Sequence, residues 1–196
     1  MAAWGEFFPE LRIVCRAAPD PALERAARRA AVELCQQSWI WQRELFPLVL
    51  AAGSTRSPLF GLPAGSRGIG LVSLVDTQGQ PVGLGGFGVS DDGQDLTHPE
   101  PGADREATPV VALAPSRSAE GLPDWMLDDY SEALQALALK RLLLQRGTAW
   151  YAPELAEWYT ALGRKEIAAA RYAERTKRVS SITTAGSRRS PFLVVG

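Results

Sequence analysis

The chain has few of the residues that catalytic and metal sites most often use. Its 196 residues include one histidine, His98, and two cysteines, Cys15 and Cys35. A single histidine excludes a multi-histidine metal site, and its place in the loop-like stretch 96–99 predicts a solvent-exposed side chain. The cysteines form no CxxC pair, so we interpret them as reduced, half-buried thiols. These shortages favour a protein that is not an enzyme and that binds neither a metal nor a cofactor.

Long apolar runs are missing as well. No apolar stretch reaches the roughly 18 residues that a membrane-spanning helix needs, so we expect none. The first residues contain no basic segment followed by an apolar run, so we expect no signal peptide. These two absences predict synthesis in the cytoplasm and no membrane partner.

The net charge of the chain is small, but the charged residues are unevenly distributed along it. The net charge is −1, yet residues 76–132 hold two Lys/Arg against twelve Asp/Glu, and residues 163–196 hold eight against two. An acidic middle and a basic end in one small chain favour complementary contacts between copies or with partners. The alternative is that both segments are solvated and flexible.

Three segments have the apolar spacing of helices. Residues 20–46, 123–146 and 153–177 carry apolar side chains three or four positions apart, and a proline stands at or beside each start. Beyond Ala133 the second segment is apolar on almost all sides, which predicts a buried central helix. The wide apolar arc of the first segment indicates contact with a neighbouring subunit as well as with its own core.

The middle of the chain has weaker signals. Residues 69–75 and 110–113 have the composition of short strands, and residues 82–84 predict a weak strand after a turn. Residues 90–108 are polar and acidic, which predicts an exposed loop. Residues 83–88 match GxGxxG, but no helix is expected after them, so a glycine-rich loop is favoured over a phosphate site.

Aromatic residues are concentrated in the helical segments. Their helical spacing predicts core packing, and the alternative is a stacking platform for single-stranded nucleic acid. The residues concerned are Trp39, Trp41, Trp125, Trp150, Tyr151, Trp158 and Tyr159.

Together these patterns predict an α+β fold that is mainly α. We expect a bundle of about three long helices with a small β-rich insertion at about 54–115. Residues 1–178 would form one domain, and residues 179–196 an extended C-terminal docking tail.

Several segments, in this order and spacing, resemble the head-to-tail adaptor proteins of tailed bacteriophages, also called connector or head-completion proteins. They are AAVELCQQSWIWQREL, PAGSRGIGLVSL, ALAPS, LPDWMLDDYSEAL and WYAPELAEWY. The resemblance covers roughly residues 20–75 and 110–175. The acidic stretch 90–108 and the residues after Val179 have no counterpart in it.

This resemblance implies a structural protein of the virion, at the junction of capsid and tail. Such subunits form a ring, usually of twelve copies, between the portal protein and the tail or nozzle proteins. The ring leaves a channel through which double-stranded DNA passes without sequence reading. C-terminal segments of the family often grip the portal, so the resemblance implies a docking role for five residues of the basic end. These are Arg175, Arg178, Arg188, Arg189 and Phe192.

Two other classes of function remain open. A small helical DNA-binding regulator would need a basic recognition helix, for which Arg25, Arg28 and Arg29 are the only candidates. A carboxylate-based enzyme would need a cleft at the acidic stretch, with Asp91 and Asp92 among its residues. The same carboxylates, with Asp95, lack the spacing of an EF-hand, which favours a plain charged loop. The chain also has the basic end that non-specific nucleic-acid binding would use.

Overall fold

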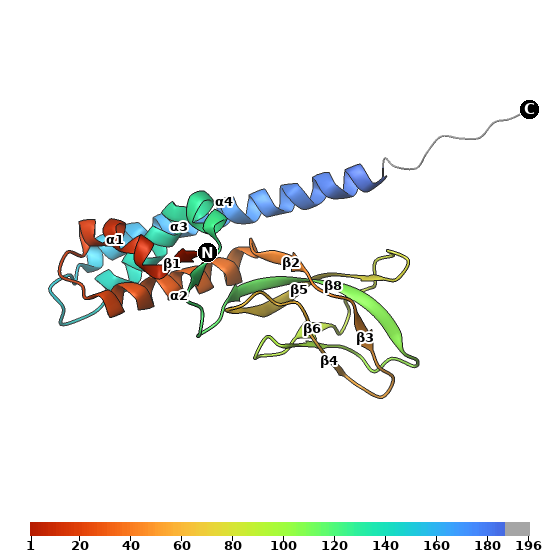
Figure 1. The fold of residues 1–196 in the computed structure, drawn as a ribbon. Helices are drawn as coiled ribbons and strands as arrows, with labels where there is room; N and C mark the ends of the chain where they lie inside the picture. The colour runs from red at the N-terminus through yellow and green to blue at the C-terminus, as the bar shows by residue number, and fades with distance from the viewer. Residues whose placement is uncertain (187–196) are drawn as a thin grey trace, which may run out of the picture.

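The chain folds as a mixed α/β structure in which helices gather in one part and strands in another (Figure 1). The computed structural model describes residues 1–186, and side chains for residues 1–177. Helices make up 42% and strands 23% of the chain, with the strands in three sheets. The predicted bundle of three long helices with a small insertion is therefore wrong. The strands form a second body of the fold, and four α-helices rather than three are present in the part described.

The helical part is assembled from both ends of the chain. Its elements are η1 (Trp4–Phe7), α1 (Phe8–Val14), α2 (Asp20–Ser38), α3 (Asp124–Leu143) and α4 (Pro153–Gly186). The sequence patterns missed the short η1 and α1. They also extended α2 to residue 46, whereas the helix ends at Ser38. Trp39 stops it with a left-handed backbone, φ 55°, and its amide donates to the Cys35 carbonyl at 2.9 Å.

α3 is the buried central helix that the sequence predicted. It starts at Asp124 after Pro123, and its second half is buried on almost every side. Non-helical angles at Tyr130 kink it, with φ −131° and ψ 22°. α2 and α4 pack against it, and Gly163 of α4 lets the side chain of Leu137 approach the helix backbone.

α4 is longer than the sequence predicted. It begins at Pro153, as expected, but runs to Gly186 rather than to residue 177. The first residues of the predicted extended tail therefore belong to a helix. Figure 1 shows α4 continuing beyond α2 and α3, away from the helical part. Residues 187–196, the rest of the predicted docking tail, lie outside the described residues.

The strand part is antiparallel throughout and is centred on one long strand. β8 (Arg105–Pro115) pairs with β5 (Ser66–Asp76) along one edge, and with β2 (Gln42–Glu44) and β3 (Leu48–Leu50) in succession along the other. A second sheet has the order β4 (Arg56–Pro58), β7 (Asp95–Thr97), β6 (Gly88–Val89). A third joins β1 (Ala2–Ala3) to β9 (Gly121–Leu122), so it ties the N-terminus to the start of α3.

Two of the three predicted strands are in the right place but are longer than predicted. β5 and β8 contain the predicted segments 69–75 and 110–113. Residues 82–84 form no strand, although the Val82 amide donates to the Leu74 carbonyl at 2.8 Å. The glycine-rich segment 83–88 is a loop that leads into β6, as predicted. The prediction of a loop for residues 90–108 is wrong, because β7 and the start of β8 lie within it.

His98 and the two cysteines are more buried than the sequence predicted. His98 is 4% exposed, and its Nε2 lies 3.0 Å from the Ser57 Oγ, while its Nδ1 lies 3.0 Å from the Pro99 carbonyl oxygen. Both cysteines are free and fully buried, and burial raises the pKa of Cys15 to about 11 and of Cys35 to about 12. All three side chains are part of the packed interior.

Candidate functional site

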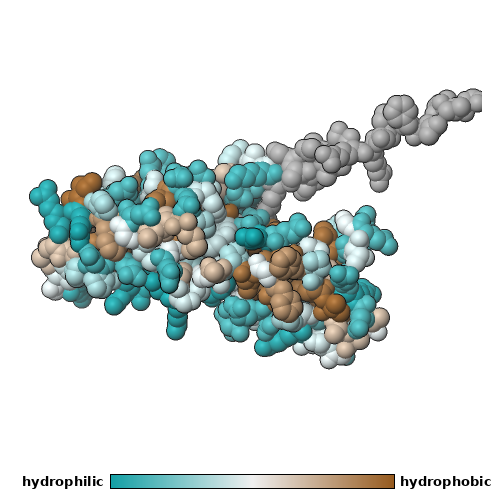
Figure 2. Space-filling model, viewed as in Figure 1, coloured by the Kyte–Doolittle hydropathy of each residue, from teal (hydrophilic) through white to brown (hydrophobic). Residues whose placement is uncertain are grey.

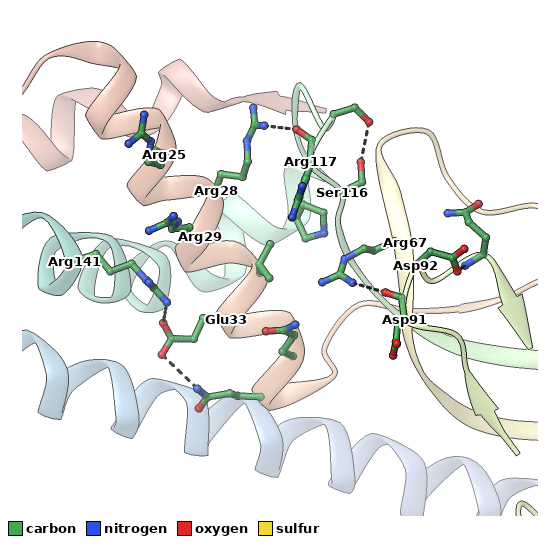
Figure 3. A pocket seen from close by; sticks show the side chains of 16 residues that line it. Arg25, Arg28, Arg29, Glu33, Arg67, Asp91, Asp92, Ser116, Arg117 and Arg141 are labelled. Atoms are coloured by element: carbon green, nitrogen blue, oxygen red, sulfur yellow. Dashed lines mark hydrogen bonds and ion pairs between the residues drawn. The ribbon is translucent and has the colours of Figure 1, made fainter. Parts of the chain in front are cut away.

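A groove of about 1130 Å³ lies where the helical part meets the strand part. Its floor and walls come from α2, α3, the start of β5, the turn before β7 and the connection after β8 (Figure 3). We call it the arginine groove, because six arginines line it: Arg25, Arg28, Arg29, Arg67, Arg117 and Arg141. Its other charged lining residues are Glu33, Asp91 and Asp92.

The helical period of α2 directs three of these arginines into the groove. Arg25, Arg28 and Arg29 are three and four positions apart, so they share one face of the helix. The opposite face carries Leu23 and Ala30, which are fully buried in the core. The fold thus anchors α2 by its apolar face and presents its basic face to the groove.

Three of the six guanidinium groups have no partner among the residues that the structure describes. The side chains of Arg25, Arg29 and Arg117 make no hydrogen bond or ion pair with any residue that the structure describes, and all three are exposed. A guanidinium group offers five donors in a planar fork that matches carboxylate and phosphate oxygens. These three side chains therefore give the groove an unsatisfied preference for anions.

Arg28 has a structural role instead. It donates to the Glu24 carboxylate at 2.8 Å and to the backbone carbonyl of Arg117, and its guanidinium lies 5.5 Å from the centre of the Trp4 ring. These contacts connect α2 to the connection after β8 and to η1. Arg28 consequently holds one wall of the groove in place.

Glu33 pairs with two cations of α3 at one end of the groove. Its carboxylate accepts hydrogen bonds from Lys140 at 2.6 Å and from Arg141 at 2.7 Å. Burial alone would raise the pKa of the Glu33 carboxyl, but these hydrogen bonds and charges outweigh burial and hold the pKa below its ordinary value. The positive charge of Arg141 is therefore already paired.

The wall opposite α2 is acidic. Asp91 and Asp92 are exposed there, and Arg67 lies beside them, with its Nη1 at 3.5 Å from the Asp91 carbonyl oxygen. The Asp92 carboxylate accepts from Ser90 Oγ at 2.6 Å and from the Gln94 amide at 3.1 Å, and mainly the first bond holds its pKa below the ordinary value. The groove therefore has a basic side and an acidic side. Asp95, the third carboxylate of the alternative enzyme site, lies in β7 outside the lining.

Of the five predicted portal-docking residues, Arg175 alone has a side chain among the described residues. Arg175 is exposed on α4, beside a smaller hollow at the end of α2. Arg178 lies in α4, but its side chain is outside the described residues, as are Arg188, Arg189 and Phe192 altogether.

Exposed aromatic residues contradict part of the core-packing prediction. Trp41 is buried, but Trp158 is 57% and Tyr151 42% exposed. Trp158 and Leu155 are three positions apart in the first turns of α4, so they share one side of the helix, and the exposed Tyr151 lies in the segment just before it. We call these three residues the aromatic stripe. Trp125 is also partly exposed.

The strand part also exposes apolar side chains. Phe46, Val49 and Phe60 are each more than half exposed, and the Phe46 amide donates to the Phe60 carbonyl at 3.2 Å. Figure 2 shows apolar residues gathered over the strand part of the face in view, while the surface of the helical part is more polar. The molecule thus has apolar surface in both of its parts.

No model of a known protein family matches the chain, and no curated protein does. Within the described residues, no group of three His, Cys, Asp or Glu side chains could hold a metal ion. None of the helices in the same residues is long and apolar enough to cross a membrane.

The arginine groove was only half visible in the sequence. Arg25, Arg28 and Arg29 share a helical face, and that spacing could identify one wall. Arg67 and Arg117 reach the groove only because β5 and β8 pair in a particular register, with Arg67 opposite Ala114. Nothing in the local sequence indicates that pairing.

Proposed function

We propose that the chain is a structural subunit of a ring that joins the portal vertex of a phage capsid to its tail, the role that its sequence resemblance implies. The observation that carries this proposal is the aromatic stripe. Leu155 and Trp158 are exposed on one side of α4, and Tyr151 is exposed just before the helix; such apolar and aromatic exposure is typical of a surface covered in an assembly.

The apolar surface of the strand part supports the same proposal. Phe46, Val49 and Phe60 lie on a different part of the molecule from the stripe. A subunit with two different contact surfaces forms head-to-tail contacts, which close into a ring when the rotation between copies permits. We propose twelve copies, with portal and nozzle proteins as neighbours and double-stranded DNA in the channel.

α4 provides a physical basis for portal docking. Its 34 residues correspond to about 50 Å of helix at 1.5 Å per residue. Figure 1 shows this length carrying the chain away from the helical part. Arg188, Arg189 and Phe192, the proposed portal contacts, follow this helix in the sequence.

The DNA-binding regulator is a weaker proposal. Its candidate residues Arg25, Arg28 and Arg29 do share a helical face, but the acidic wall formed by Asp91 and Asp92 stands across the groove from them. Phosphates in the groove would be repelled by that wall, whereas binding of duplex DNA depends on uncompensated positive charge.

Electron microscopy of the chain mixed with the portal protein encoded in the same phage genome tests the proposal. We expect a ring of the chain bound coaxially to the portal. A double variant, Leu155→Ser with Trp158→Ala, should lose the ring, whereas the matched control Trp125→Ala, on α3, should keep it. A chain that ignores the portal and instead binds short duplex DNA with a steep salt dependence would overturn the adaptor proposal in favour of the regulator.

A further inference from the structure

The long strand β8 separates two oppositely charged regions of the molecule. Pro115, at one end of β8, lines the arginine groove, and Arg105, at the other end, pairs with Leu50 of β3. Eleven residues of extended chain span about 35 Å. The two ends of β8 therefore cannot meet within one molecule, because the paired strands β5, β2 and β3 hold β8 extended.

The far end of β8 bears an acidic tip, which we define as Glu100, Asp104 and Glu106. All three side chains are exposed, and none forms an ion pair with a described residue. Asp104 accepts a hydrogen bond from the Ala52 amide at 2.7 Å, which fixes the connection between β7 and β8 against the turn after β3. Arg105 is the one basic residue between them, so the tip is net negative.

We propose that the acidic tip of one copy docks in the arginine groove of the next copy. Within the described residues, Glu100 and Glu106 of the tip make no side-chain hydrogen bond or ion pair, and neither do the guanidinium groups of Arg25, Arg29 and Arg117. Arginine and carboxylate form paired, charge-assisted hydrogen bonds, which set orientation as well as affinity. The contact joins two different surfaces of the same chain, so it propagates from copy to copy.

The shape and lining of the groove favour a protein segment over a phosphate ligand. Its volume of about 1130 Å³ exceeds the roughly 300–1,000 Å³ of pockets that hold small molecules. The acidic wall at Asp91 and Asp92 disfavours a ligand that is anionic along its whole length. Gln36, Ser116 and Ser118 also line the groove, and their neutral polar groups can form hydrogen bonds with the peptide backbone of an acidic segment.

This contact specifies how neighbouring subunits of the proposed ring would meet. The closure of such contacts into a ring rests on the proposed function, whereas the pairwise contact does not. A charge exchange tests the contact. The groove variant carries Arg25→Glu and Arg29→Glu, the tip variant carries Glu100→Arg and Glu106→Arg, and the exchanged variant carries all four changes. A control with the same charge change as the groove variant carries Arg146→Glu and Arg164→Glu, two exposed arginines outside the groove.

Sedimentation velocity at low salt measures association of the full chain. We expect the groove and tip variants each to weaken self-association at least about tenfold, and the exchanged variant and the control to stay within about threefold of the unaltered chain. An equimolar mixture of groove and tip variants should associate as the unaltered chain does, because each tip then meets a groove of opposite charge. The proposed contact would be overturned if all variants associated equally, or if the exchanged variant associated as weakly as the groove variant or the tip variant.

Disulfide trapping covers the case of weak association. A copy with Ala103→Cys at the tip is mixed with a copy that has Ser118→Cys in the groove, with and without the portal protein. Both positions are exposed, whereas the native cysteines are buried, so the engineered pair reports the contact. We expect mixed dimers, and their absence in both conditions would sink the proposal. Portal-bound rings that assemble equally well from the groove variant alone or the tip variant alone would rule out this contact and leave the adaptor function standing. Trapped dimers that do not bind the portal protein would support this contact and contradict the adaptor function.

Discussion

The helical part and the strand part of this molecule are stabilised in different ways. In the helical part, small and branched apolar side chains pack closely between helices, as Ala30, Leu34 and Leu137 do. In the strand part, stability depends on close backbone approaches and on a buried polar pair, Ser57 with His98. The first kind of packing tolerates small shifts of side chains, and the second does not. Changes of similar size should therefore have unequal effects in the two parts.

The largest effect is expected at Gly93, where the turn before β7 meets β5. A Cβ at this position would lie 2.4 Å from the Gly68 carbonyl oxygen and 2.8 Å from the Gly68 nitrogen, and the Gly93 backbone is left-handed, with φ +75°. These two Gly68 atoms belong to the backbone and cannot rotate away. We expect Gly93→Ala to lower the free energy of unfolding by about 4 kcal/mol, measured by urea denaturation.

Gly163→Ala in α4 is the matched control. Its Cβ would lie 2.9 Å from Leu137 Cδ2, the end of a flexible side chain, and the helix favours alanine over glycine. The change in stability should stay within about 1 kcal/mol. Equal losses at the two glycines would break the comparison between the two parts.

Within the helical part, the loss of stability on replacing a leucine by alanine should depend on how deeply that leucine is buried. Leu137 is 1% exposed in the middle of α3, so Leu137→Ala should cost about 3 kcal/mol. Leu155→Ala, at the exposed aromatic stripe, should cost less than about 1 kcal/mol. Thermal unfolding of both variants distinguishes them, and a large loss at Leu155 would mean that the stripe belongs to the core.

The same contrast explains what the sequence could predict. The starts of α2, α3 and α4 and the burial of α3 follow from apolar spacing and prolines within one segment, so local patterns revealed them. The end of α2 did not, because Trp41 and Leu45 continue the apolar spacing although Trp39 has already turned the chain. A left-handed tryptophan leaves no signature in a periodic pattern.

The strand part was predicted poorly because its structure is non-local. β7 lies in an acidic stretch whose composition is that of a loop, and only pairing with β4 and β6 makes it a strand. His98 was expected at the surface because its neighbours are polar, but Ser57, distant in sequence, meets its ring. The arginine groove depends on pairing of the same kind, so the sequence indicated its α2 wall alone.

Ser57→Ala tests the buried polar pair of the strand part. The Ser57 hydroxyl donates to the Val49 carbonyl at 2.9 Å, and its oxygen lies 3.0 Å from His98 Nε2, so the variant leaves both the carbonyl oxygen and the ring nitrogen without this partner. We expect a loss of about 2 kcal/mol by urea denaturation. Ser116→Ala, which removes only a bond to the exposed Ser118, should change stability by less than about 0.5 kcal/mol. Similar values for the two serines would deny the pair a stabilising role.

Glu33 is the counterpart of this pair in the helical part, and its effect should depend on pH. Its carboxylate is 14% exposed and accepts from Lys140 and Arg141, which hold its pKa below the ordinary 4.5 despite burial. A lowered pKa in the folded state means that the stabilisation is complete above the ordinary value and is lost as the pH falls through the folded value. Glu33→Gln should therefore cost about 1.5 kcal/mol near pH 7 and progressively less toward about pH 3. The control Glu24→Gln, at a more exposed ion pair with Arg28, should cost under about 0.5 kcal/mol. A difference between the unaltered chain and Glu33→Gln that stays constant with pH would show that the shape of the side chain, and not its charge, joins α2 to α3.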